Sequence, residues 1–113
     1  MAETASRRQI GEYLDVDLVS EQWLCNRCDH PLGSARKNYK EGCLIRDRDP
    51  TEIHRPVVEG DYTFAPDPEW CRIVEFYCPS CAVMIESEYL PPGHPLTHDI
   101  ELDIDALKRE LEA

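Results

Sequence analysis

The sequence predicts a small, β-rich α+β fold made of hairpins, extended loops and a short C-terminal helix. Two C-x2-C pairs, Cys25 with Cys28 and Cys78 with Cys81, are separated by 49 residues in a chain of 113. Short runs of alternating apolar and polar residues flank them, as is typical of strands. Nine prolines, two phenylalanines and 31% charged residues interrupt the apolar segments. Hairpins that carry paired thiols are the hallmark of zinc ribbons, so the predicted fold is zinc-ribbon-like.

The length predicts one compact domain that buries about two-thirds of the surface of its unfolded form. Residues 1–9 are polar and are predicted to form a flexible N-terminal arm. Residues 10–113 are predicted to form a single zinc-binding domain with extended docking segments. Because its core is modest, a bound metal or a large partner would add useful stability.

The first predicted strand lies in "YLDVDLV", where Leu14, Val16 and Leu18 alternate with Asp15 and Asp17. This alternation fits a strand with one buried face. Between the two cysteine pairs, prolines, glycines and charges interrupt each candidate element. We expect one short helix near residues 34–41 there and expect docking, rather than a local core, to order the rest.

The strongest strand signal is "CRIVEFYC", with Ile73 and Tyr77 on one face and Val74 and Phe76 on the other. It leads to Cys78, and "AVMIESEYL" can return as a second strand, so the tip of this hairpin carries the thiols.

Two segments follow this hairpin. The prolines of "LPPGHPLTHD" predict an extended loop. In "DIDALKRELEA" the spacing of Ile104, Leu107 and Leu111 predicts a short helix with Asp103 as its N-cap.

The spacing predicts that Cys25, Cys28, Cys78 and Cys81 bind one structural zinc ion. Two residues between thiols let one tight turn present both sulfurs to a tetrahedral Zn²⁺. Four thiolates fill that tetrahedron, which disfavours a catalytic zinc with an open position for water. The alternative is a redox dithiol, which needs its first cysteine at a helix N-terminus, and neither pair begins a credible helix.

Other polar residues are weaker candidates. Cys43 and Cys71 are read as small buried side chains, and His30 as a solvated or supporting residue, although each could replace a zinc ligand. His54 has no identifiable partner.

The motif "GHPLTHD" brings His94, His98 and Asp99 together. A second metal site or an acid–base pair is conceivable there, but a rigid interface loop is favoured because no nucleophile accompanies the histidines. No catalytic residue is predicted.

A net charge of −11 would repel a phosphate backbone, which argues against a nucleic-acid partner. The start "MAETASRRQI" lacks the apolar segment of a signal peptide, and no later run has the roughly 20 apolar residues that span a bilayer. We therefore expect a cytoplasmic protein, in which six cysteines are more plausibly ligands or free thiols than disulfides.

The motifs "CDHPLGSARKNYK", "IRDRDP", "APDPEW", "VEFYCPSC" and "LPPGHPLTHDIELDID" occur in an order that resembles a known family. The family that it resembles is that of the small zinc-binding subunits of bacterial ATP-dependent ketone carboxylases, the group that contains acetone carboxylase and acetophenone carboxylase. The similarity spans roughly residues 23–106. The short polar lead favours the acetophenone type over the acetone type.

The resemblance implies a noncatalytic assembly subunit of a hetero-oligomer that converts a ketone, bicarbonate and ATP into a 3-oxo acid. It also implies large partner subunits related to hydantoinases, with ATP and a divalent cation bound on those partners. Only the four paired cysteines carry over as functional residues. The alternatives are an adaptor subunit of an acetone carboxylase or hydantoinase-like complex, and a C-x2-C redox protein.

Overall fold

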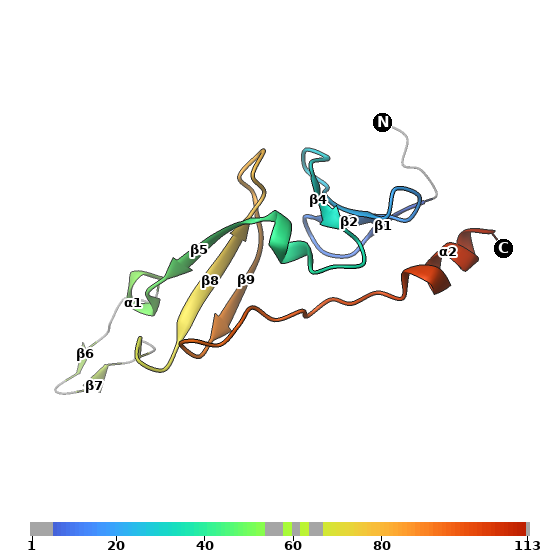
Figure 1. Cartoon of the computed structure of the whole chain (residues 1–113). Helices are drawn as coiled ribbons and strands as arrows, with labels where there is room; N and C mark the ends of the chain where they lie inside the picture. Colours follow the sequence, from blue (N-terminus) through green and yellow to red (C-terminus); the bar gives the residue numbers. More distant parts are fainter. Residues whose placement is uncertain (1–5, 54–57, 60–61, 64–66, 113) are drawn as a thin grey trace.

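The chain is elongated. A computed structural model describes residues 6–53, 58–59, 62–63 and 67–112. The molecule measures 63 × 26 × 19 Å, and its radius of gyration of 17.6 Å exceeds the roughly 13 Å of a compact domain of this length. Two antiparallel sheets lie one after the other along the long axis (Figure 1).

The first sheet, sheet A, is a four-stranded meander in the order β1-β2-β3-β4. Its strands are β1 (Arg7–Gln9), β2 (Leu14–Asp17), β3 (Gln22–Cys25) and β4 (Pro31–Ser34). The predicted strand in "YLDVDLV" is present as β2, but Asp15 is buried rather than exposed. Arg7 Nε lies 2.7 Å from Asp15 Oδ2 and neutralises it, which explains the burial of this carboxylate.

Strand β1 differs from the sequence prediction. Residues 7–9 were assigned to a flexible arm, yet they pair with Asp15–Asp17 of β2. The residues "RRQ" are all polar, so they show no apolar alternation that would predict a strand. Their pairing instead depends on the Arg7–Asp15 ion pair and on backbone hydrogen bonds to β2. The remaining division into an arm and a single domain stays a prediction.

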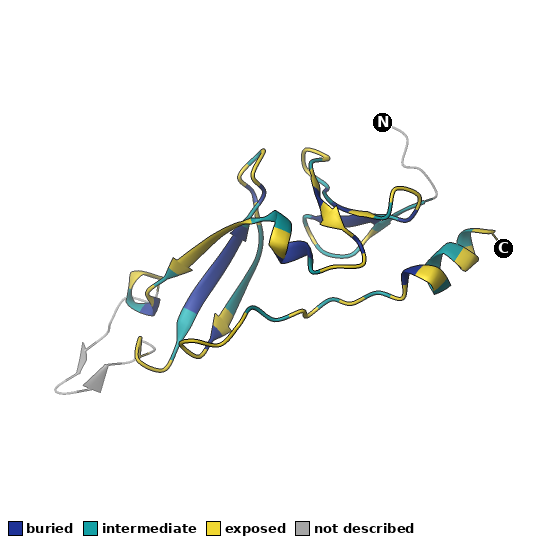
Figure 2. Ribbon diagram, viewed as in Figure 1, coloured by how far each residue is buried: buried dark blue, intermediate teal, exposed yellow. Residues whose placement is uncertain are grey.

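The second sheet, sheet B, has the order β5-β8-β9. Its strands are β5 (Leu44–Arg48), β8 (Arg72–Tyr77) and β9 (Met84–Leu90). The predicted β8–β9 hairpin is present, and β8 is buried along most of its length because strands flank it on both sides (Figure 2). Strand β5 was not predicted, since four of its five residues are exposed and its pattern lacks a buried face.

The remaining short elements lie between β4 and β8. They are the 3-10 helix η1 (Tyr39–Gly42), the helix α1 (Pro50–Ile53) and the two-stranded sheet of β6 (Val58–Glu59) and β7 (Tyr62–Thr63). The helix expected near residues 34–41 is therefore only the η1 turn, capped by the Asn38 side chain. Residue 34 belongs to β4 instead.

The larger core lies under sheet A and includes two of the predicted ligands. Its buried members are Leu14, Val16, Leu18, Trp23, Cys25, Leu32, Ala35, Tyr39, Cys78, Val83 and Ile104. A smaller cluster of Val74, Phe76 and Leu90 lies against sheet B. The contact of Cys78 and Val83 with residues of sheet A joins the two halves of the molecule.

The end of the chain returns from sheet B to sheet A. Residues 91–103, here called the strap, run extended along the molecule to the helix α2 (Ile104–Glu112) (Figure 1). The predicted helix and its cap are present, because the Asp103 side chain accepts a hydrogen bond from the Ala106 N–H at 3.0 Å. The buried Ile104 attaches α2 to the larger core. Among the described residues, no helix is both long and apolar enough to cross a membrane.

Candidate metal centre

The four paired cysteines lie on two turns of the same construction. Cys25 ends β3, and its carbonyl accepts a hydrogen bond from the Asp29 N–H at 2.7 Å. Cys78 follows β8, and its carbonyl accepts one from the Ala82 N–H at 2.9 Å. Asp29 and Ala82 both have a φ of 63°, the left-handed conformation that reverses the chain after the second thiol.

A second hydrogen bond closes each turn. The Cys25 N–H donates to the His30 carbonyl, and the Cys78 N–H donates to the Val83 carbonyl, both at 2.9 Å. The equivalent bonds give each turn the same shape, with both thiols on one side. The Ser80 N–H also points at Cys78 Sγ, 3.4 Å away, and would stabilise a thiolate there.

The turns face each other and bring the four sulfurs together. The thiol sulfurs of Cys25, Cys28, Cys78 and Cys81 all lie within 4.8 Å of one another. Cys25 Sγ is 3.7 Å from Cys81 Sγ, and Cys28 Sγ is 3.5 Å from Cys78 Sγ. A tetrahedron with metal–sulfur bonds of about 2.3 Å has sulfur–sulfur edges of about 3.8 Å, so the donor set fits a tetrathiolate zinc site.

These sulfur–sulfur distances are too long for disulfide bonds. A disulfide requires about 2.05 Å between sulfurs, far less than either separation. All six cysteines are free in this structure.

The environments of the thiols differ. Burial raises the pKa of Cys25 to about 12, against the effect of hydrogen bonds from the backbone of Cys28 and Arg27. Burial acts in the same direction on Cys28, but hydrogen bonds from the His30 backbone and from the neighbouring thiols lower its pKa to about 7. A divalent cation would favour the thiolate at each position, because cation binding displaces the thiol proton.

Comparison with known proteins identifies a family whose model covers most of the chain. A family model described as "Acetone carboxylase gamma subunit" matches residues 8–112, which include both turns and the strap.

The chain belongs to the acetone carboxylase gamma subunit family.

Two relatives show the range of this gamma subunit family. The acetophenone carboxylase beta subunit of Aromatoleum aromaticum is 59% identical over 106 residues, covering 94% of this chain and 82% of the relative. The acetone carboxylase gamma subunit of Xanthobacter autotrophicus is 28% identical over 93 residues. That match covers 81% of this chain and 54% of the relative. The resemblance read from the motif order is thus confirmed, and the chain is a member of a family of carboxylase subunits.

The structure separates the other candidate ligands of this gamma-family chain from the four-thiol cluster. Cys43 Sγ points to the Tyr39 carbonyl at 3.6 Å, and burial together with the nearby Cys78 raises its pKa to about 11. Cys71 Sγ points to the Arg72 carbonyl. His30 supports the site through its backbone, and among the described residues the cluster has four members, without Cys43, Cys71 or His30. His54 lies outside the described residues.

Of the three residues that the sequence singled out in the "GHPLTHD" motif, Asp99 makes a buried contact and the two histidines do not. His94 and His98 are exposed, and the His94 carbonyl accepts a hydrogen bond from Arg72 at 2.6 Å. Thr97 and Asp99 instead contact Lys40, whose side chain is 1% exposed.

Lys40 was missed by sequence reasoning. Its ammonium pairs with Glu88 and Asp99 and donates to the Thr97 carbonyl at 3.1 Å. It also lies 5.1 Å from the centre of the Phe76 ring, a cation–π contact. These contacts attach the strap to sheet B. Only the unusual burial of a lysine reveals the role, and no local pattern in "RKNYK" predicts it.

Proposed function

We propose that this chain is the small, noncatalytic assembly subunit of an ATP-dependent ketone carboxylase, held in shape by a structural zinc ion. The observation that carries the proposal is the cluster of four thiols between sheets A and B in a chain of the gamma subunit family. Cys25 and Cys28 come from the turn after β3, and Cys78 and Cys81 from the turn after β8. One metal ion there would join the two sheets.

Zinc is the metal that this donor set favours. Thiolate ligands select soft or borderline metals, and a tetrahedral set of four sulfurs is typical of structural zinc. The sulfur separations of 3.5 and 3.7 Å need little adjustment to reach the expected tetrahedron. Because a structural zinc site can contribute on the order of 10 kcal/mol of apparent binding free energy, it would dominate the stability of so small a core.

The saturation of this site supports a noncatalytic role for the metal. Four thiolates occupy all positions of a tetrahedral zinc ion, which leaves no place for water or substrate. We propose that ATP, its divalent cation, bicarbonate and the ketone bind on larger partner subunits related to hydantoinases. The chain would act in the cytoplasm, as an architectural part of that complex.

The acetophenone type is the favoured form of this enzyme. The relative named as an acetophenone carboxylase subunit shares 59% identity with this chain, against 28% for the acetone carboxylase subunit. We propose the conversion of an aromatic methyl ketone, with bicarbonate and ATP, to a 3-oxo acid. An adaptor role in an acetone carboxylase or in a hydantoinase-like complex is the alternative, and the identity of the co-purifying subunits distinguishes it.

The redox alternative has less support. The short sulfur–sulfur distances of 3.5 and 3.7 Å run between the two turns rather than within one C-x2-C pair. Each pair also follows the end of a strand, and the turn after β8 leads into β9, so no helix N-terminus activates the first thiol.

The direct test replaces one thiol. Cys78→Ser removes a buried donor, so we expect the chain to lose zinc and the yield of assembled complex to fall at least tenfold. Metal analysis and co-purification with the larger subunits measure the two effects. Cys71→Ser is the matched control, because Cys71 lies outside the four-thiol cluster, and it should retain both zinc and assembly. Normal zinc content and an intact complex with Cys78→Ser would contradict the proposal.

A further inference from the structure

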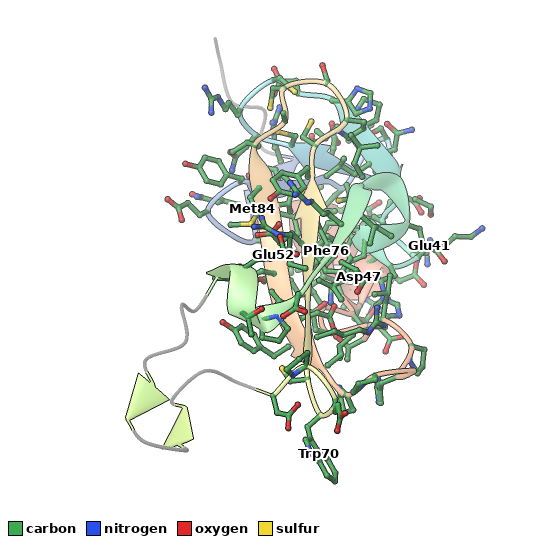
Figure 3. The ribbon with its side chains drawn as sticks, turned by 90° about the vertical axis from the view of Figure 1, so that its left-hand side faces the viewer. Glu41, Asp47, Glu52, Trp70, Phe76 and Met84 are labelled. Atoms are coloured by element: carbon green, nitrogen blue, oxygen red, sulfur yellow. The ribbon has the colours of Figure 1, made fainter. Side chains whose placement is uncertain are left out.

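The exposed apolar side chains of this chain are concentrated on one half of the molecule. Seven large hydrophobic residues are exposed among those described, namely Val19, Leu44, Ile45, Ile53, Trp70, Met84 and Tyr89. Only Val19 belongs to sheet A, in the turn after β2. The other six lie on sheet B or on segments next to it, and Trp70 projects from the end of that sheet (Figure 3).

The strand register divides these residues between the two faces of sheet B. Three rows of paired residues form one face, here called the outer face: Leu44 with Tyr77 and Met84, Arg46 with Glu75 and Ser87, and Arg48 with Ile73 and Tyr89. Leu44 is 57% exposed, Met84 43% and Tyr89 53%. These three side chains belong to the two edge strands, whereas Ile73 and Glu75 of the central strand β8 are only 2% and 8% exposed on the same face.

The chain itself covers part of the opposite face, although Ile45 of β5 remains 49% exposed there. Val74, Phe76 and Leu90 form a buried cluster there, with Leu96 of the strap packed against it. Lys40 lies over the Phe76 ring on the same side. The strap therefore provides the β8–β9 part of the inner face with a partner, whereas Leu44 and Met84 of the outer face are exposed to solvent.

The composition of the outer face is that of a protein interface. Tyrosine, methionine and arginine are enriched at such interfaces, and lysine and acidic residues are depleted. Two arginines, Arg46 and Arg48, and one glutamate, Glu75, belong to the rows of this face, on a chain with a net charge of −11. Arg48 already pairs with Glu75 and Glu52. Arg46 is exposed, and the ion pairs of the described part of the chain do not include it.

We infer that the outer face of sheet B is the surface that docks on a larger subunit of the carboxylase. The partner surface would be apolar opposite Leu44, Met84 and Tyr89, with a carboxylate opposite Arg46. This inference rests on the proposed function, because a carboxylase subunit has other subunits to bind. The elongated shape supports it, since sheet B extends away from the metal centre (Figure 1).

The test places a charge on each edge strand of the outer face, at the two ends of one row. Leu44→Asp and Met84→Asp would each desolvate a carboxylate in the interface, so we expect at least a tenfold loss of affinity for the tagged larger subunits when all subunits are co-expressed. Val19→Asp is the matched control, because Val19 is 74% exposed on sheet A. It should assemble within twofold of the wild-type chain.

A charge reversal gives an independent readout. Arg46→Glu should also weaken assembly, and its effect should shrink at high salt, because the lost attraction is electrostatic. The effect of Leu44→Asp should not shrink in this way. Zinc content and thermal unfolding of the isolated variants should match wild type, since the replaced side chains are exposed.

The outcomes separate the two proposals. A wild-type chain that recovers no larger subunit would overturn the proposed function, and with it this docking surface. A wild-type chain that assembles while Leu44→Asp and Met84→Asp assemble equally well would overturn only the docking surface. The same holds if sedimentation shows a dimer of the isolated chain that Leu44→Asp dissociates without affecting the complex, because the outer face would then bind a second copy.

Discussion

Lys40 shows how a single side chain holds distant parts of the chain together. It lies in η1, yet its ammonium contacts Glu88 of β9 and both Thr97 and Asp99 of the strap. A buried ammonium is stable only when its charge and hydrogen bonds are satisfied, and here two carboxylates and a carbonyl satisfy them. The residue therefore fixes where the strap crosses sheet B.

Replacement of Lys40 by methionine should destabilise the chain strongly. The change leaves Glu88 nearly buried without its cation, and breaking such a pair costs about 3 kcal/mol or more. Urea unfolding of the zinc-loaded chain measures the loss. The exposed Lys37, replaced in the same way, is the control and should change stability by less than about 0.5 kcal/mol. Addition of Glu88→Gln to Lys40→Met should recover part of the loss. Equal stability of Lys40→Met and Lys37→Met would contradict this role of Lys40.

Gly42 is a second position where one residue type is required. A Cβ atom there would lie 2.8 Å from Leu32 Cα and closer still to the Leu32 carbonyl, so the end of η1 packs directly on the backbone of β4. Gly42→Ala should cost about 1–3 kcal/mol through overpacking, measured as a lower midpoint of thermal unfolding. Gly11→Ala is the control, since its Cβ would meet only Leu14 Cβ at an ordinary 3.7 Å. An unchanged midpoint for Gly42→Ala would show that the two segments separate easily.

At the scale of elements, α2 depends on tertiary contacts rather than on its own length. A helix of 9 residues is marginal alone in water. The buried side chain of Ile104 anchors its first turn. Arg36 forms ion pairs with Asp105 of the helix at 2.7 Å and with Glu21 at 2.6 Å. Lys108 of the helix also pairs with Glu21, at 2.6 Å. These pairs attach the helix to the loops that flank sheet A.

The ion pairs around α2 determine how its stability depends on pH and on salt. Lys108 and then Arg36 lower the pKa of Glu21, and Arg36 lowers the pKa of Asp105. A carboxylate with a lowered folded-state pKa stabilises the fold above its unfolded pKa and loses that contribution as the pH falls through the folded value. The contribution is therefore complete at neutral pH, where salt rather than a small pH change would reduce it.

Arg36→Gln should accordingly loosen α2 without affecting the metal centre. We expect hydrogen exchange of the α2 amides to accelerate a few-fold at neutral pH and low salt, with a smaller difference in 0.5 M salt. Lys37→Gln, on the neighbouring exposed side chain, should leave the exchange rates unchanged. The prediction fails if Arg36→Gln and Lys37→Gln exchange alike.

The elements also show how far the sequence alone is informative. Strands β2, β8 and β9, the C-terminal helix and its Asp103 cap were predictable, because their apolar periodicity and capping signals are local. Strands β1 and β5 were not, since their residues are mostly polar or exposed and pair only through partners distant in the sequence.

The same distinction applies to the candidate site. The C-x2-C spacing selected all four thiols that the structure brings together, because each pair is set by one tight turn. The contacts of Lys40 and the position of the strap depend on residues 48 to 59 positions apart, which no local pattern records.

At the scale of the whole molecule, the metal centre lies where the two sheets meet. The two cysteine turns meet there, and the strap also joins the two halves, since it runs from β9 past Lys40 to α2 (Figure 1). The chain is too elongated to bury a large core, so a metal ion between the sheets would set their relative position. Zinc binding and assembly should therefore be linked.

Native mass spectrometry of the untagged complex, with metal analysis, tests this account most directly. We expect each copy of this chain to retain one zinc ion and to be found with larger subunits whose ATP hydrolysis depends on a ketone. A chain that assembles with those subunits without metal, or a metal-free monomer with a reversible dithiol, would contradict the account.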